Sequence, residues 1–348
     1  MAPTPPETPV PSHGPRRRLG LLLVDGFALM SYAALIEPFR AANSLAGEAL
    51  YSWAHVSVGP GRARASNGAT LLSDQQVGEA LDCDIVFVFA GGDPTTFSDG
   101  ATFGWLRQLA GRGVSLAGVS GGPYLLARAG LLEGHRATIH WEHAAVFREE
   151  FPDVALETGL YVIDRRRMTC AGGAAGLDFA LELIERDHGH ALASRVGEWF
   201  IRTEPRRAER PQRLSLRERY GVRHDGALRA LAAMEAAVEE PLARQALSQI
   251  AGVSVRQLER LFRSQLNATV AEVYLRVRLE QADRLLRTTG LSVTAVAVAC
   301  GFASSSHFAR VFRRAFGRAP GADRRSQGGR RAQGKDAAPS VSDALIGA

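Results

Sequence analysis

The chain has 348 residues, 46% of them apolar, which is enough for two or three domains with buried cores. The formal net charge is +6, but residues 1–220 hold 23 basic and 25 acidic residues, whereas residues 221–325 hold 16 and 9. Three cysteines without metal-ligand spacing, and no apolar stretch approaching a membrane span, argue against a disulfide framework, a metal centre and a membrane protein. We therefore expect a cytoplasmic protein whose basic C-terminal part suits a nucleic-acid partner.

The first two hundred residues have the pattern of an α/β domain. Residues 1–18 are rich in proline and end in three arginines, which predicts a disordered leader. From Leu19 onward, apolar runs that end in glycine alternate with amphipathic helices, so residues 19–200 predict an α/β domain with a mostly parallel sheet. The expected strands are 19–24, 51–58, 84–90, 114–119, 161–164 and 168–171, and the expected helices are 30–44, 102–112, 123–129 and 174–188.

The remainder of the chain predicts helices without strands. Residues 201–224 are rich in arginine, proline and glutamate with weak periodicity, and we expect a linker there. Residues 225–325 contain little glycine or proline before Gly317 and predict an all-α domain. Residues 326–348 have the composition of a disordered tail.

One pattern occurs twice in this helical part. A short apolar-faced helix, a turn at Gly252 or Gly301, and a helix with arginines on one face form each copy, which is the pattern of a helix-turn-helix. Leu247, Ile250 and Ala251 are expected to pack beneath the first turn, and Val296, Val298 and Ala299 precede the second turn. A long helix over about 270–288 would fix the two units, so that both recognition helices can enter successive major grooves.

The outward positions of the second helix in each copy are the candidate DNA contacts. Arginine and glutamine can bind guanine and adenine edges, and arginine also binds phosphate. A solvated helix face is an alternative for any single arginine, but the repeated set favours DNA. The candidates are Ser254, Arg256, Gln257, Arg260 and Arg263 in the first copy and Ser304, Ser305, Ser306, His307, Arg310 and Arg313 in the second.

A sharp turn is predicted at Ser120. The sequence from Gly118 to Gly122 fits G-x-S-x-G between a strand and a helix, the setting of a nucleophile elbow. The candidate base is His140, only 20 residues further on, whereas a serine hydrolase normally has its acid and histidine much later in the chain. A hydrolase or amidase fused to a DNA-binding domain therefore stays an alternative, and not the favoured one.

The turn and several later segments resemble a known family. Residues 118–127, 137–141 and 171–178 resemble the N-terminal domain of GlxA-type AraC-family regulators, which belongs to the DJ-1/PfpI, or class I glutamine amidotransferase-like, superfamily. Residues 300–310 resemble the AraC/XylS signature. The resemblance spans Leu19 to about Arg325. It implies a flavodoxin-like sheet, a small-molecule effector, a homodimer, and an activator that binds double-stranded promoter DNA and recruits RNA polymerase.

Two departures from the superfamily's enzymes concern the elbow. Those enzymes place a cysteine nucleophile at the position of Ser120 and an acidic residue near the start of the first helix, where this chain has Ser31. A hydroxyl needs a strong base, whereas a thiol is already partly ionised. We therefore expect a domain that binds its ligand without turning it over, with no enzyme activity, no cofactor and no metal.

Residues 30–43 and 140–142 resemble the members that govern catabolism of glycine betaine, carnitine or arginine. Trp141 and Tyr32 suit a quaternary ammonium group by cation–π contact, and Ser120 with the turn N–H groups suits a carboxylate. Core or dimer-interface packing is an equal alternative for both aromatic residues, a structural role is one for His140, and a constitutive DNA-binding protein is a third hypothesis. The candidate ligand-binding residues are Ser31, Tyr32, Glu37, Asn67, Ser120, Gly121, His140, Trp141 and Glu142.

Overall fold

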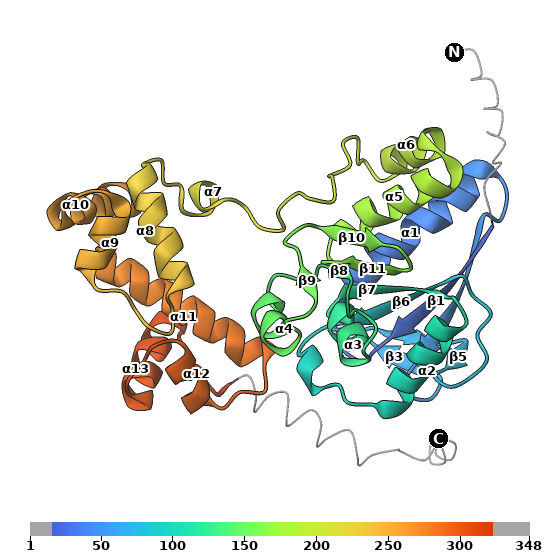
Figure 1. Cartoon of the computed structure of the whole chain (residues 1–348), viewed down its shortest axis with the longest axis horizontal. Coiled ribbons are helices and arrows are strands. Elements are labelled where there is room, and N and C mark those ends of the chain that lie inside the picture. Colours follow the sequence, from blue (N-terminus) through green and yellow to red (C-terminus); the bar gives the residue numbers. More distant parts are fainter. Residues whose placement is uncertain (1–15, 323–348) are drawn as a thin grey trace, which may run out of the picture. The chain divides into compact units, whose positions relative to one another are not determined.

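The computed structural model describes residues 16–322, and the chain divides into two compact units between Leu214 and Ser215 (Figure 1). The first unit is α/β and the second is helical, as predicted. Residues 1–15 and 323–348 lie outside the described residues, and so do the predicted tail and most of the predicted leader. Arg17 and Arg18, which we expected in the leader, already belong to the first strand.

A seven-stranded sheet organises the described part of the first unit, in the order β10-β11-β7-β6-β1-β2-β5. All neighbouring pairs are parallel except β10 and β11. The central order β2-β1-β6-β7-β11 is flavodoxin-like. From β1 the chain first adds β2 on one side and then β6, β7 and β11 on the other, so the strand order switches between β1 and β6. At such a switch point the carboxyl ends of the strands form the usual ligand crevice. The strands are β1 (Arg17–Leu23), β2 (Tyr51–Ser57), β5 (Gln75–Gln76), β6 (Ile85–Ala90), β7 (Ser115–Ser120), β10 (Tyr161–Asp164) and β11 (Arg167–Cys170).

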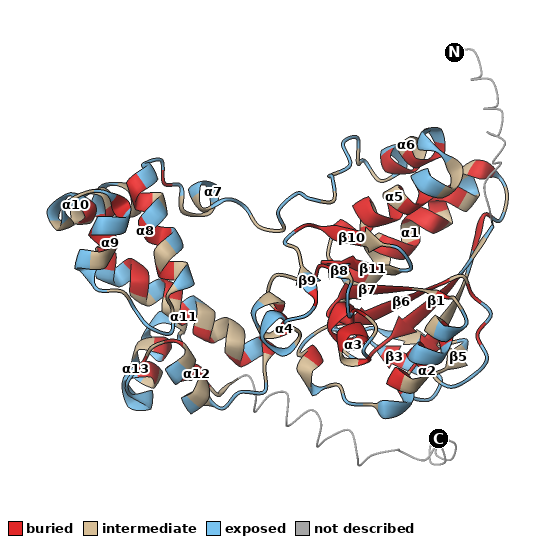
Figure 2. Cartoon of the chain, viewed as in Figure 1, coloured by how far each residue is buried: buried red, intermediate tan, exposed pale blue. Residues whose placement is uncertain are grey.

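Helices cover both faces of the sheet, because parallel strands expose apolar side chains in two directions. Along β1, Leu21 and Leu23 face one core and Leu22 faces the other. Figure 2 shows the buried strands between the two helix layers. One layer contains α1 (Leu29–Ala46), α5 (Ala175–His188) and α6 (His190–Trp199), and the other contains α2 (Gly100–Gly111), α3 (Gly122–Arg128) and α4 (Ala144–Glu150).

Short elements complete the first unit. They are a 3-10 turn, η1 (Pro94–Thr96), and two small two-stranded sheets, β3 (Arg62–Arg64) with β4 (Thr70–Leu72) and β8 (Arg136–Ala137) with β9 (Ala155–Leu156).

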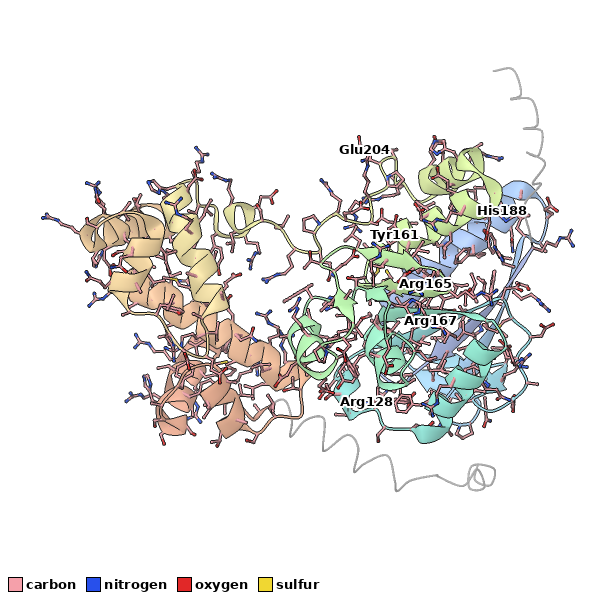
Figure 3. All side chains as sticks on the ribbon, viewed as in Figure 1. Arg128, Tyr161, Arg165, Arg167, His188 and Glu204 are labelled. Atoms are coloured by element: carbon pink, nitrogen blue, oxygen red, sulfur yellow. The ribbon has the colours of Figure 1, made fainter. Side chains whose placement is uncertain are left out.

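The segment after α6 packs on the first unit and is not a free linker, which revises our expectation for residues 201–224. Asp178 on α5 has a fully buried side chain, and it accepts hydrogen bonds from Arg202 (Nη2–Oδ1, 3.0 Å) and Arg206 (Nη2–Oδ2, 2.7 Å). The backbone N–H of Leu160 donates to the carbonyl of Ala208 (2.6 Å). We call residues 202–214 the strap; it carries Glu204, labelled in Figure 3.

The second unit consists of helices in its described part. Each helix-turn-helix has its own core, with Leu247, Leu258 and Phe262 in the first and Phe308 and Phe312 in the second. The helices are α7 (Leu216–Tyr220), α8 (Asp225–Ala236), α9 (Arg244–Ala251), α10 (Val255–Leu266), α11 (Val270–Thr288), α12 (Val293–Ala299) and α13 (Ser305–Phe316).

The expectation that Ile250 packs beneath the first turn is wrong, and Val298, just before the second turn, is exposed as well. Their side chains are 41% and 58% exposed. Leu247 and Ala251, four residues apart on α9, take the inner positions, and Val296 and Ala297 do so on α12. Ile250 and Val298 therefore lie on the outer sides of short helices that have few buried positions to share.

Candidate nucleic-acid interface and ligand site

The two predicted turns have the local chemistry that a helix-turn-helix requires. Gly252 ends α9 in the left-handed conformation (φ 70°), which glycine adopts without steric cost. Ser254 then caps α10, and its backbone N–H donates to the Gln257 side-chain oxygen (2.9 Å) in a reciprocal capping box. Ser304 caps α13 by accepting from the His307 N–H (3.4 Å). These contacts determine where each recognition helix begins.

Every predicted DNA-contact residue is exposed, while the opposite faces of α10 and α13 are buried. Arg256, Arg260 and Arg263 follow one side of α10. Gln257 is also exposed, but its carbonyl oxygen is used by the cap, which leaves its NH₂ group for a base. On α13, a hollow of about 460 Å³ is lined by Ser306, Ala309, Arg310, Arg313 and Arg314. Contact between these side chains and DNA remains a prediction.

Two arginines that the sequence analysis missed hold the turns. Arg229 on α8 donates to the carbonyls of Ile250 (3.0 Å) and Ala251 (2.6 Å) at the end of α9. Arg278 on α11 donates in the same way to Cys300 (2.8 Å) and Gly301 (2.6 Å). The last carbonyls of a helix lack hydrogen-bond partners within the helix. Each arginine guanidinium therefore supplies donors to two backbone carbonyls at the end of a helix.

The spacing of these arginines contains a signal. Arg229 and Arg278 are 49 positions apart, as are Gly252 and Gly301, so the repeat could have identified them. Arg278 also lies over the Phe302 ring, 4.2 Å from its centroid, and burial lowers the pKa of its guanidinium.

In the first unit, β7 ends in the predicted elbow. Ser120 has φ 61°, which is rare outside glycine, and its side chain is 8% exposed. α3 begins two residues later, at Gly122, where an added Cβ would lie 1.9 Å from the carbonyl oxygen of Val88. The backbone therefore turns so tightly against β6 that glycine is required beside the serine.

Three of the predicted ligand residues meet at this elbow. A Cβ added to Gly172 would lie 2.7 Å from both the Ser31 hydroxyl oxygen and the Ser120 Cβ. The Ser31 hydroxyl accepts a hydrogen bond from the Gly173 N–H (2.7 Å). The His140 N–H approaches the Ser120 carbonyl oxygen at 3.4 Å. Ser31, Ser120 and His140 thus come together at the carboxyl ends of the parallel strands.

The expectation that N–H groups of the turn are available for a carboxylate fails at Gly121. Its N–H donates to the carbonyl of Ala90 (3.0 Å). Among residues 16–322, none forms a hydrogen bond with the Ser120 hydroxyl.

Burial lowers the pKa of both histidines beside the elbow. Burial lowers the pKa of His140, although the Glu142 carboxylate, 3.7 Å from Nδ1, partly offsets this effect. Burial and the charge of His140 lower the pKa of His143 to about 4. Both effects follow from the cost of placing a charged imidazole in a poorly solvated position.

Comparison with known proteins agrees with this geometry. Residues 17–186 match the DJ-1/PfpI family, and residues 247–326 match a helix-turn-helix domain. The chain is 41% identical over 313 residues to the HTH-type transcriptional regulator GlxA of Rhizobium meliloti, which covers 90% of this chain and 97% of that protein. The chain belongs to the AraC family of helix-turn-helix regulators with an N-terminal DJ-1/PfpI domain.

Two relatives from Pseudomonas aeruginosa extend this family assignment. The HTH-type transcriptional regulator CdhR is 41% identical over 303 residues, covering 87% of this chain and 90% of that protein. The HTH-type transcriptional regulator GbdR is 38% identical over 324 residues, covering 92% and 88%. Both units of this AraC-family chain therefore have counterparts in the same relatives.

Three other candidate residues already have partners within the AraC-family chain. The Tyr32 hydroxyl lies 2.8 Å from His55 Nε2. Glu37 accepts from Arg40 Nε (2.7 Å) on the surface of α1. Asn67 is exposed and its side chain accepts from the N–H two residues on, as in an ordinary turn. Their roles in ligand binding remain predictions.

Two hollows on the first unit, of about 360 and 320 Å³, are lined by residues other than Ser120. Tyr161, labelled in Figure 3, lines both, together with Glu182 and Arg207. Within residues 16–322, no cluster of three His, Cys, Asp or Glu side chains has the arrangement of a metal site. No helix in that range is long and apolar enough to cross a membrane.

Proposed function

We propose that this AraC-family chain is a transcriptional activator that senses a small metabolite, of the quaternary-amine or amino-acid type, without chemically changing it. The observation that carries this proposal is the Ser120 elbow, which keeps a strained backbone (φ 61°) while none of the described residues forms a hydrogen bond with its hydroxyl. The groups at such an elbow can still contact a ligand, because ligand binding needs shape and polar groups and not an activated nucleophile.

The side chains around the elbow support this ligand class. Trp141 supplies an aromatic face for a cation, and Glu142 supplies a negative charge close to it. The hydroxyls of Ser120 and Ser31 supply polar contacts for the other end of a zwitterionic molecule.

The output of the regulator is promoter binding through α10 and α13. We propose that the chain acts as a homodimer. The ligand shifts the equilibrium between different arrangements of the two DNA-binding units of the dimer. The dimer bound to the promoter then recruits RNA polymerase. The exposed arginines on both recognition helices support the DNA-binding step.

The experiment is a thermal-shift screen of the full chain with glycine betaine, carnitine, choline and arginine, followed by promoter-binding assays with each compound that stabilises it. A ligand at 100 times its dissociation constant should add about 2.7 kcal/mol of stability. If no compound changes the melting temperature or the DNA affinity, the first unit is no sensor of this ligand class.

A hydrolase or amidase is the second candidate, and the positive φ of Ser120 favours it, since such strain is common at catalytic elbows. Ser120→Ala separates the two functions. A sensor should show no hydrolysis of amide or ester substrates before or after the substitution. Measurable hydrolysis that Ser120→Ala abolishes would instead establish the enzyme.

A further inference from the structure

The end of the strap is attached to the residues that follow the elbow. The Gln212 side-chain oxygen accepts a hydrogen bond from the Trp141 N–H (2.8 Å). Its amide nitrogen lies 2.9 Å from the carbonyl oxygens of both Ile139 and Gly159 and donates to them. One side chain of the strap thus takes up the backbone polar groups on either side of His140.

The next residue of the strap occupies the aromatic face that the sequence suggested for a ligand cation. The Arg213 guanidinium carbon lies 4.3 Å from the centroid of the Trp141 ring, within the range of a cation–π contact. A guanidinium and a quaternary ammonium group are attracted to the same ring face by the same quadrupole. A cation on this face of Trp141 and Arg213 in this position therefore exclude each other.

Gln212 and Arg213 lie at the end of the strap, next to the boundary between the two units. Leu214 is the last residue of the first unit, and Ser215, the capping residue of α7, is the first of the second. Gln212 and Arg213 thus contact Ile139 and Trp141 just before the chain enters the DNA-binding unit. Arg213 therefore lies directly before the connection to the DNA-binding unit.

We propose that Arg213 is a built-in occupant of a cation site on Trp141, and that a ligand carrying an ammonium or guanidinium group displaces it and releases the end of the strap. This inference rests on the proposed sensor function and adds the mechanism by which the site acts on the connection. The strap then remains anchored at its beginning by Asp178, which holds Arg202 and Arg206. Ligand binding would lengthen the free connection without detaching the whole segment.

The first experiment compares full-length wild type, Arg213→Gln and the control Arg210→Gln, which changes an exposed arginine of the same strap. Calorimetric titrations with choline and with arginine measure competition. Removal of the internal cation should tighten binding about 3- to 10-fold in Arg213→Gln, and the control should match wild type. Unchanged or weaker binding in Arg213→Gln would overturn the proposal, and so would the absence of binding by both probes to either chain.

The second experiment follows the strap itself by hydrogen exchange and mass spectrometry on the same full-length proteins. The Trp141 amide is the direct reporter because it donates to Gln212. Without any probe, Arg213→Gln should exchange faster than wild type in peptides covering residues 138–147 and 202–214, while Arg210→Gln should not. Saturating choline or arginine should produce the same change in wild type. Unchanged exchange in Arg213→Gln shows that Arg213 does not hold the strap.

These outcomes separate this inference from the proposed function. If a compound stabilises wild type and alters DNA binding, but Arg213→Gln neither binds it more tightly nor exchanges faster, the sensor stands and the displacement mechanism is wrong. If no compound of the screen binds, the sensor of this ligand class and the cation site fail together. Arg213→Lys provides a further comparison, because a compact ammonium keeps the charge but loses the planar stacking of the guanidinium.

Discussion

Asp178 makes the strap's most buried polar contact, and its replacement by asparagine tests how much this anchor contributes. The carboxylate has no exposed surface and accepts from Arg202 and from both the side chain and the backbone N–H of Arg206 (2.8 Å for the backbone contact). Asparagine keeps the shape but removes the charge and points an N–H₂ group toward guanidinium donors.

The expected loss of stability depends on how exposed the two arginine partners of Asp178 are. Breaking a fully buried ion pair by removing one partner costs about 3–5 kcal/mol. Arg202 and Arg206 are 30% and 32% exposed, so water can partly replace the lost carboxylate. We therefore expect Asp178→Asn to lower the free energy of unfolding of the first unit by about 2–4 kcal/mol.

Tryptophan fluorescence during urea unfolding of the full chain measures this change. All four tryptophans, at positions 53, 105, 141 and 199, lie in the first unit, so the signal reports that unit alone. Glu182→Gln is the matched control on the same helix. Its half-exposed pair with Arg186 should contribute less than about 1 kcal/mol. A loss in Asp178→Asn no larger than in the control would refute the reasoning.

Three further predictions concern the recognition helices, the turns and the elbow histidine. Arg256→Ala and Arg310→Ala should each weaken promoter binding by about 1–3 kcal/mol in fluorescence anisotropy titrations without altering the melting temperature, and unchanged affinity would remove either residue from the interface. Arg278→Ala leaves two carbonyls at the end of α12 without their partner and should destabilise the second unit by about 1–3 kcal/mol, measured by circular dichroism; a stability equal to wild type would contradict this role. Burial lowers the pKa of His143 from 6.5 to about 4, so the unfolded state binds a proton first as the pH falls. The stabilisation should be fully present above about pH 6.5 and decrease as the pH falls toward 4, by about 1.4 kcal/mol at pH 5.5. His143→Gln should remove this part of the pH dependence.

The order of the elements was predictable because it depends on local periodicity. Continuous apolar runs predicted β1, β6 and β7, and Gly252 with Ser254 predicted the first helix-turn-helix, since glycine and serine have conformational preferences that act within a few residues. The elbow at Ser120 was predictable for the same reason.

The partners of individual side chains were not predictable in the same way. The periodicity of a short helix did not distinguish Ile250 from Leu247, because both are apolar and three residues apart, yet Leu247 is buried and Ile250 is 41% exposed. The capping use of Gln257 and the bond from Gly121 to Ala90 also depend on positions that only the folded backbone brings together.

The sequence by itself determined that an α/β domain with a serine at its elbow precedes two DNA-reading helix-turn-helix units, because those features are encoded in short stretches of residues. Only the tertiary structure decided that the presumed linker is a strap clamped by Asp178, and that Arg213 already lies on Trp141. Arg213 and Trp141 are far apart in the chain, and no periodicity or motif relates them. They come into contact because two hydrogen bonds hold the strap beside the sheet. The Leu160 N–H donates to Ala208, and the Trp141 N–H donates to Gln212.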